Sequence, residues 1–222
     1  MYELRYFGLN DTGNQFLRAK WREIIQTQDT DSKEYKSGEM RVDRYLVFLP
    51  QSNDDKNKLL EASATFGVKF RGVERPSDDY GSTVEVKILE KRKQGGAERY
   101  TKNIYPDIKS AVTFLNMLNI VKDLDLQFTA DVKDWKQVEV EKKISKHCFG
   151  SRNDMWRLEF NELKIRGKLH CSLNLEAKKA VTCYKNLGCE VENFSREGCE
   201  MINILQGGYP RLCKWIFSND CF

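Results

Sequence analysis

The chain has 222 residues, and its 37 Lys and Arg against 33 Asp and Glu leave a formal net charge of only +4. This near balance excludes a polybasic nucleic-acid coat, in which Lys and Arg far outnumber the acids. Intrinsic disorder is also excluded, because 40% hydrophobic and 11% aromatic residues are enough to bury a core. The informative question is therefore where the charged residues lie along the chain.

The cysteines and the N-terminus indicate a reducing compartment. The cysteine count is odd, no CxxC pair occurs, and no apolar signal-peptide stretch follows Met1. We therefore expect free thiols in the cytosol or the nucleus, and a structural zinc site lacks its usual spacing. No apolar run approaches the roughly 20 residues of a membrane helix, so no membrane association is expected. The seven cysteines are Cys148, Cys171, Cys183, Cys189, Cys199, Cys213 and Cys221.

Most patterned segments are typical of strands. They combine β-branched and aromatic residues with a period of two, which predicts antiparallel strands. Polar loops are predicted over 29–39, 51–57 and 94–97. In chain order, the predicted strands are 2–9, 41–49, 67–73, 83–91, 98–105, 136–147, 155–165 and 168–177.

Helical periodicity is less frequent. A helix is predicted after the first strand, over 15–26, and another over 107–119, where Pro106 suits a helix start. After the last strand, Gly188 suits the C-cap of a third helix. Together with the strands, these segments predict one α+β domain over 1–222. Its predicted C-terminal helices are 178–187, 195–205 and 210–217, within 178–222.

The charges of the predicted strands lie in phase. In the strand 83–91, Glu85 and Lys87 share one face, while Val84 and Val86 share the other. Two interpretations follow: an open sheet with its charges in water, or a closed barrel with its charges inside. The mixed signs and the apolar helix stripes, which need a sheet face to cover, favour the barrel. The same alternation applies to Lys69, to Glu139, Glu141 and Lys143, to Arg157 and Glu159, and to Asn174 and Glu176.

A mixed-charge lumen has an evident chemical use. Lys and Arg neutralise phosphate oxygens, Arg in a bidentate manner. Carboxylates bind Mg²⁺ or Mn²⁺, which prefer oxygen ligands. An antiparallel β-barrel with such a lumen and with helices on its outside is therefore suited to a polyphosphate–metal complex.

Short charged motifs follow one another in a defined order over residues 40–177. An Asp-containing strand precedes a Lys-x-Arg strand and a strand ending in Lys, and the second half runs basic, acidic and closing strands. The motifs are Arg41-Val42-Asp43-Arg44-Tyr45, Gly67-Val68-Lys69-Phe70-Arg71, Val84-Glu85-Val86-Lys87, Glu98-Arg99-Tyr100-Thr101-Lys102, Val138-Glu139-Val140-Glu141-Lys142-Lys143, Leu158-Glu159-Phe160 and Asn174-Leu175-Glu176.

This order resembles the CYTH superfamily, the triphosphate tunnel metalloenzymes, which include thiamine triphosphatases, inorganic tripolyphosphatases and RNA 5′-triphosphatases. The resemblance implies metal-dependent hydrolysis of a triphosphate, a polyphosphate or an RNA 5′ end, with Mg²⁺ or Mn²⁺ as cofactor. The implied phosphate-binding residues are Lys69, Arg71, Lys87, Lys102, Lys143 and Arg157. The implied metal ligands are Glu3, Glu139, Glu159 and Glu176, and the implied catalytic residues are Glu159, Glu176 and Lys87.

The chain also departs from the family. The first-strand signature is Glu-x-Glu-x-Lys, but Glu3 is followed by Arg5 and Phe7 at the second and third positions. The closing Glu-x-Glu pair begins with Asn174 instead of Glu. These changes motivate a non-catalytic alternative that binds a polyphosphate, a nucleotide or an RNA 5′ end. A protein-interaction module built on an open, two-faced sheet is the third alternative.

Overall fold

The computed structural model describes residues 1–27, 33–48, 58, 62, 65–70, 83–93, 96–150, 154–188, 204–209 and 212. The strands are β1 (Tyr2–Gly8), β2 (Lys33–Phe48), β3 (Phe66–Phe70), β4 (Val84–Arg92), β5 (Glu98–Tyr105), β6 (Trp135–Phe149), β7 (Trp156–Ile165), β8 (Lys168–Ala177) and β9 (Ile204–Gln206). The helices are α1 (Asp11–Thr27), α3 (Ile108–Met117), α4 (Asn119–Asp123) and α5 (Ala180–Cys183), with a 3₁₀ turn at Val132–Asp134 and a π-helical turn at Tyr184–Gly188.

The strands close into an eight-stranded antiparallel barrel, which confirms the predicted α+β class. Their hydrogen-bonded order is β5-β4-β3-β2-β6-β7-β8-β1, and β1 pairs back onto β5. The closing pairs are Tyr2 with Arg99 and Glu3 with Glu98. Further along the edge of β1 that pairs with β5, β9 pairs with residues 6–8. The short β1–β5 seam is thus continued by a strand from the C-terminal part of the chain.

The chain divides into two compact units. Unit 1 comprises Met1–Arg41, Glu90–Tyr100 and Glu141–Gly208. Unit 2 comprises Val42–Leu89, Thr101–Val140 and Tyr209–Phe222. Each unit has its own hydrophobic cluster.

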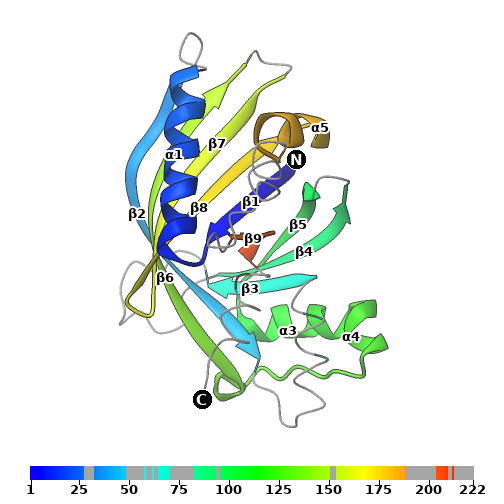
Figure 1. Cartoon of the computed structure of the whole chain (residues 1–222). Helices are drawn as coiled ribbons and strands as arrows, with labels where there is room; N and C mark the ends of the chain where they lie inside the picture. The colour runs from blue at the N-terminus through cyan, green and yellow to red at the C-terminus, as the bar shows by residue number, and fades with distance from the viewer. Residues whose placement is uncertain are drawn as a thin grey trace. The chain divides into compact units, whose positions relative to one another are not determined.

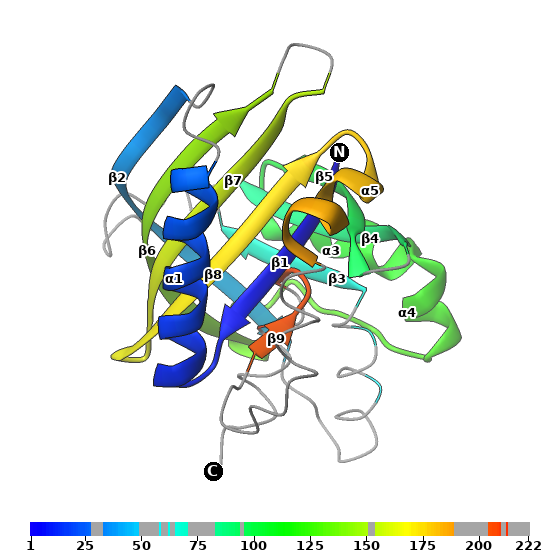
Figure 2. The same cartoon turned by 45° about the horizontal axis from the view of Figure 1, so that its top comes forward.

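In unit 1, α1 packs on the apolar face of β1, β7 and β8 (Figures 1 and 2). The helix begins where the side chain of Asn10 accepts a hydrogen bond from Gly13 N at 2.8 Å. Its inward side places Phe16 and Leu17 in the core. Every second residue of the strands packs against this side of α1, because side chains along a strand point alternately to the two faces of the sheet. The buried strand members are Leu4, Tyr6, Leu158, Phe160, Leu173 and Leu175.

A side-chain bridge fixes α1 on β8. Asn14 Oδ1 accepts from Cys171 N at 2.7 Å, and Asn14 Nδ2 donates to Leu169 O at 3.1 Å. We expect Asn14→Ala to lower the free energy of unfolding by about 1–2 kcal/mol, because two backbone groups lose their partner. Urea unfolding of this variant beside Gln15→Ala, an exposed neighbour on the same helix, measures the effect. Equal stability of the two variants would contradict the bridge.

In unit 2, α3 covers the apolar faces of β3 and β4 (Figure 1). The carboxylate of Asp107 caps the helix by accepting from Ser110 N at 2.7 Å. The buried side of α3 is formed by Ala111, Val112 and Leu115. These side chains belong to one cluster with Val68, Phe70, Val84 and Val86 of the sheet and with Phe48, Phe128 and Trp135.

The predicted strands and helices are largely confirmed, and four differences stand out. Residues 33–39, predicted as loop, begin β2, because pairing within the sheet stabilises a polar strand. The predicted helix 107–119 breaks at Leu118, whose backbone is extended, and α4 follows. Gly188 ends a π-helical turn rather than following a helix. The predicted helix 195–205 is wrong at its end, where β9 begins, and residues 195–203 lie outside the described residues.

Other predictions fall largely outside the described residues. These include the loop 51–57, the strand end 71–73 and most of the helix 210–217. Cys148, Cys171 and Cys183, the three cysteines among the described residues, are free thiols. None of the described helices is long and apolar enough to cross a membrane.

Candidate anion-binding site

The polar face of unit 1 is the side of β1, β7 and β8 opposite α1. Strand register aligns its residues in rows, because directly opposed residues point to the same side of a sheet. One row joins Glu159, Asn174 and Arg5, and the next joins Arg157, Glu176 and Glu3. The polar face therefore consists of Glu3, Arg5 and Phe7 of β1, Arg157, Glu159 and Asn161 of β7, and Ser172, Asn174 and Glu176 of β8.

Glu159 of β7 has several charged and polar partners on this face. Its carboxylate accepts from Arg5 Nη2 at 3.4 Å and from Asn161 Nδ2 at 3.1 Å, and it lies 3.4 Å from Lys146 Nζ. Burial by itself would raise the pKa of Glu159. The charge of Arg5, the hydrogen bond from Asn161 and the charges of Lys146 and Lys142 outweigh burial and lower the pKa to about 2. Glu159 is thus a fixed anion held by several donors.

This arrangement predicts a pH dependence of stability. A carboxylate whose pKa is lower in the folded state stabilises the fold above its unfolded pKa, and the contribution is lost as pH falls. The pKa of Glu159 falls from 4.5 to about 2. The contribution, roughly 3 kcal/mol, is therefore complete above pH 4.5 and disappears between pH 4.5 and 2. Urea unfolding at pH 7 and pH 3 should show a smaller pH effect for Glu159→Gln than for the wild type.

The pH effect has a matched control. Glu162→Gln alters a neighbouring carboxylate of β7 whose side chain is 38% exposed and which pairs with Arg18. We expect the wild-type pH effect in this variant, because solvent-exposed pairs contribute little. An identical pH effect in Glu159→Gln and the wild type would show that Glu159 does not carry it.

In the second row, Glu176 has its own hydrogen-bond donors, and Glu3 lies beside it. Arg157 donates to Glu176 Oε2, and Asn174 Nδ2 donates to Glu176 Oε1 at 3.2 Å. Burial alone would lower the pKa of Arg157, but the charge of Glu176 and its hydrogen bond raise it. Glu3 lies directly opposite both Glu176 and Glu98, so that three acids adjoin across β8, β1 and β5.

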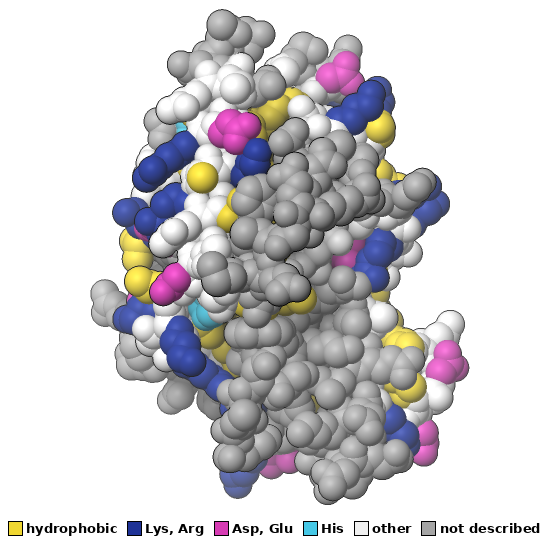
Figure 3. Space-filling view, in the orientation of Figure 1, with side chains coloured by type: hydrophobic (Ala, Val, Ile, Leu, Met, Phe, Trp, Pro, Cys, Tyr) yellow, Lys and Arg dark blue, Asp and Glu magenta, His cyan; other side chains and the backbone are white. Residues whose placement is uncertain are grey.

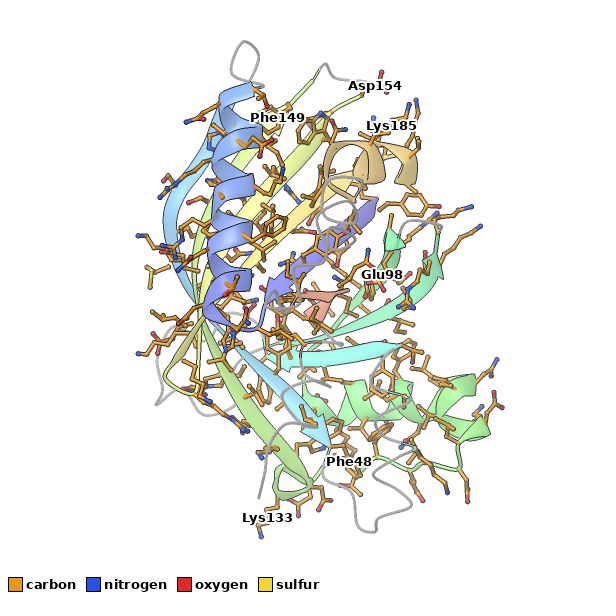
Figure 4. The ribbon with its side chains drawn as sticks, viewed as in Figure 1. Phe48, Glu98, Lys133, Phe149, Asp154 and Lys185 are labelled. Atoms are coloured by element: carbon orange, nitrogen blue, oxygen red, sulfur yellow. The ribbon has the colours of Figure 1, made fainter. Side chains whose placement is uncertain are left out.

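Glu98 of β5, labelled in Figure 4, joins three parts of unit 1. Its carboxylate accepts from Arg92 Nε at 2.9 Å, from the Tyr100 hydroxyl at 2.6 Å and from Gly208 N at 3.0 Å. Burial and the adjacent charge of Glu98 raise the pKa of Tyr100, so its hydroxyl remains a donor. With 2% of its surface exposed, Glu98 connects β4, β5 and the segment after β9.

Unit 2 has its own charged row. Lys69 of β3 lies between Tyr45 of β2 and Glu85 of β4 in the register. Its ammonium is 3.3 Å from Asp43 Oδ2 and 3.6 Å from Glu85 Oε1, and it lies over the Tyr45 ring. Lys87 lies opposite Gly67 and is half-buried. Lys69 is therefore held by two acids rather than extended into water.

The structure places the predicted site residues in different surroundings. Glu85 is only 6% exposed, and the side chains of Glu159 and Glu176 are 12% and 14% exposed. The open-sheet alternative requires these groups in bulk solvent and is wrong. Lys102, by contrast, is exposed, and Arg71 lies outside the described residues.

The predicted charge face of β6 is the wrong one. Glu139 and Lys143 are each 56% exposed and pair with Arg44 and Glu162 respectively. The buried side of the strand carries Val138, Val140 and Ile144 and, with them, Lys142 at 1% exposure. Alternation shows which residues share a face but not which face is buried. Lys146 continues the Lys142 side, and neither lysine was predicted.

Two of the predicted metal ligands, Glu159 and Glu176, already have basic partners. Oxygen ligands must converge on one point to hold Mg²⁺ or Mn²⁺. Glu159 instead pairs with Arg5 and Lys146, and Glu176 pairs with Arg157. Among the described residues, no group of three or more His, Cys, Asp or Glu side chains could hold a metal ion.

Some buried polar atoms of unit 1 have no hydrogen-bond partner within the described part of the chain. Asn161 Oδ1 and Asn174 Oδ1 accept no hydrogen bond from the described residues, and Arg157 Nε finds no acceptor among them. Native proteins usually satisfy such atoms with protein groups, water or ligand.

On the surface, basic and acidic side chains lie interspersed over the described part of one face (Figure 3).

Comparisons with known proteins give structural likeness only. No protein-family model matches the sequence, and the search of curated proteins finds no match. A protein of Bacillus halodurans described as a "putative adenylate cyclase" has 10% identity and a TM-score of 0.40, with 88% of this chain and 92% of that chain covered. A Pyrococcus horikoshii protein has 14% identity and a TM-score of 0.42, covering 98% and 99%. A conserved hypothetical protein of Pyrococcus furiosus has 12% identity and a TM-score of 0.39, covering 90% and 94%.

Proposed function

We propose that this chain binds a triphosphate or polyphosphate group on the polar face of unit 1 without hydrolysing it. The observation that carries the proposal is a set of four basic side chains, two on this face, from β1 and β7, and two from the neighbouring strand β6. They are Arg5, Lys142, Lys146 and Arg157. Guanidinium and ammonium groups are the preferred partners of phosphate oxygens.

Exposure and hydrogen bonding support an anion rather than a neutral ligand. The side chains of Arg157 and Lys146 are 34% and 16% exposed, so both can meet a ligand from solution. Arg157 Nε is a buried donor without an acceptor among the described residues. A phosphate oxygen would satisfy it, while Glu159 and Glu176 hold the basic groups in position.

Metal-dependent hydrolysis with Mg²⁺ or Mn²⁺, acting on a triphosphate or an RNA 5′ end, is the second proposal. The adjacency of Glu3, Glu98 and Glu176 in the register favours it. It ranks second because Glu98 and Glu176 already hold Arg92 and Arg157. The family resemblance and the free thiols suit either function in the cytosol or nucleus.

Two assays on the purified protein separate the proposals. Calorimetric titration with tripolyphosphate in EDTA should show binding, and added Mg²⁺ or Mn²⁺ should release no phosphate from tripolyphosphate, thiamine triphosphate or nucleoside triphosphates. Phosphate release that requires the metal would establish the hydrolase instead. Absence of tripolyphosphate binding under every condition would overturn both proposals.

A further inference from the structure

Arg5 lies among the acids of the polar face. Along β1 it is two residues from Glu3, on the same side of the strand. Across the sheet, Asn174 separates it from Glu159, and Glu176 lies diagonally, next to Glu3. The register thus places three acidic residues next to the buried Arg5, and one of them, Glu159, forms an ion pair of 3.4 Å with its guanidinium.

We propose that the guanidinium of Arg5 does the electrostatic work of a divalent cation, so that phosphate binding needs no metal. This inference rests on the proposed function and assigns to Arg5 the part of a buried cation between the acids at that site, beside the pairs that Lys146 and Arg157 form with Glu159 and Glu176. Three adjacent carboxylates repel one another and any bound phosphate unless a cation lies between them. Arg remains charged at every physiological pH, so its compensation is permanent.

The backbone around Arg5 is fixed in a way that suits this role. Gly207 N donates to Arg5 O at 2.8 Å, and β9 pairs with β1 immediately beyond it, through Tyr6 and Gln206. Arg5 is 6% exposed, and its guanidinium contacts Glu159, whose pKa it helps to lower. The positive charge of Arg5 is therefore a fixed, buried part of β1, whereas a metal ion could dissociate into solvent.

The test removes the charge and supplies a metal in its place. In Arg5→Gln the acids lose the buried guanidinium between them, while Lys146 and Arg157 remain, and we expect MnCl₂ alone to raise the melting temperature of this variant by about 3 °C or more. The wild type should show no such shift. In EDTA, tripolyphosphate should bind Arg5→Gln at least about tenfold more weakly than the wild type. Mn²⁺ should recover part of that loss.

Two further variants keep the test decisive. Arg5→Lys retains a cation, so it should bind tripolyphosphate in EDTA and show no Mn²⁺ shift, and it replaces Arg5→Gln as the informative variant if the latter does not fold. Arg18→Gln removes an exposed arginine of α1 and should behave as the wild type. A Mn²⁺ shift in the wild type or in Arg5→Lys, or no shift in folded Arg5→Gln, would overturn the inference.

The experiment distinguishes failure of the proposed phosphate binding from failure of the proposed role of Arg5. If the wild type binds no tripolyphosphate but Arg5→Gln alone is stabilised by Mn²⁺, the polyphosphate ligand is wrong and the cation role of Arg5 stands. If the wild type binds tripolyphosphate only with Mn²⁺, the binding proposal stands and the role of Arg5 is wrong. The metal-only melting curves and the EDTA titrations therefore report on separate claims.

Discussion

Replacing Arg5 by methionine is expected to destabilise the protein by about 3–5 kcal/mol, because it leaves Glu159 buried without its closest guanidinium. The side chains of the pair are 6% and 12% exposed, so water cannot take over the role of the partner. The free energy of unfolding at pH 7, from urea denaturation monitored by circular dichroism, measures the loss. The pKa of Glu159 should rise in this variant, since the charge of Arg5 is what chiefly opposes the effect of burial.

Arg18→Met is the matched control for this prediction. Arg18 pairs with Glu162 at 3.0 Å, but the two side chains are 46% and 38% exposed. Exposed pairs contribute about 0–1 kcal/mol, so this variant should stay near the wild type. If both variants lose the same stability, the Arg5–Glu159 pair has no special role. The double variant Arg5→Met/Glu159→Gln should lose less than Arg5→Met, since no buried charge is left unpaired.

Replacing Glu98 by alanine is the second large effect, with an expected loss of about 3 kcal/mol. The carboxylate accepts from Arg92, the Tyr100 hydroxyl and Gly208 N, and all three donors would be left without it. Because Gly208 follows β9, amide hydrogen exchange at Gly207 and Gly208 should quicken. The first measurement is chemical denaturation, and the second is exchange followed by NMR.

Glu90→Ala provides the comparison on the preceding strand. Glu90 pairs with Arg99 at 2.8 Å through side chains that are 39% and 54% exposed. Its replacement should cost at most about 1 kcal/mol and leave exchange at Gly207 and Gly208 unchanged. Unaltered exchange in Glu98→Ala would contradict the proposed connection between Glu98 and the segment after β9.

The existence of β1 and β3–β8 and of the second half of β2 was predictable from the period-two patterns in the sequence, whereas β9 and the start of β2 were not. In β8 the pattern Leu173-Asn174-Leu175-Glu176 separates a buried apolar face from a polar one, and the register confirms it. The start of β2 was missed because residues 33–39 are polar and carry no apolar alternation. Such a strand depends on pairing with its neighbours, and pairing is a property of the folded sheet.

The site was predictable only in part. The phase of the strands places Glu159, Glu176 and Arg157 on the charged faces, and their predicted roles follow from the family resemblance. Their ion pairs could not be predicted, since Arg5 and Glu159 are 154 positions apart and only strand register joins them. Lys142 was missed for another reason. It continues the apolar side of β6 after Val140, and a lysine in that phase gives no sequence signal of burial.

Binding of tripolyphosphate in EDTA by the wild type, Lys146→Gln and Lys164→Gln tests the central claim most directly. Lys146 lies 3.4 Å from Glu159 within the proposed site, whereas Lys164 forms a half-exposed pair with Glu141. We expect the wild type and Lys164→Gln to bind alike, and Lys146→Gln to bind about tenfold more weakly, since one charge-assisted contact is lost. Equal affinity of the two lysine variants, or no binding by the wild type, would contradict metal-independent phosphate binding on this face.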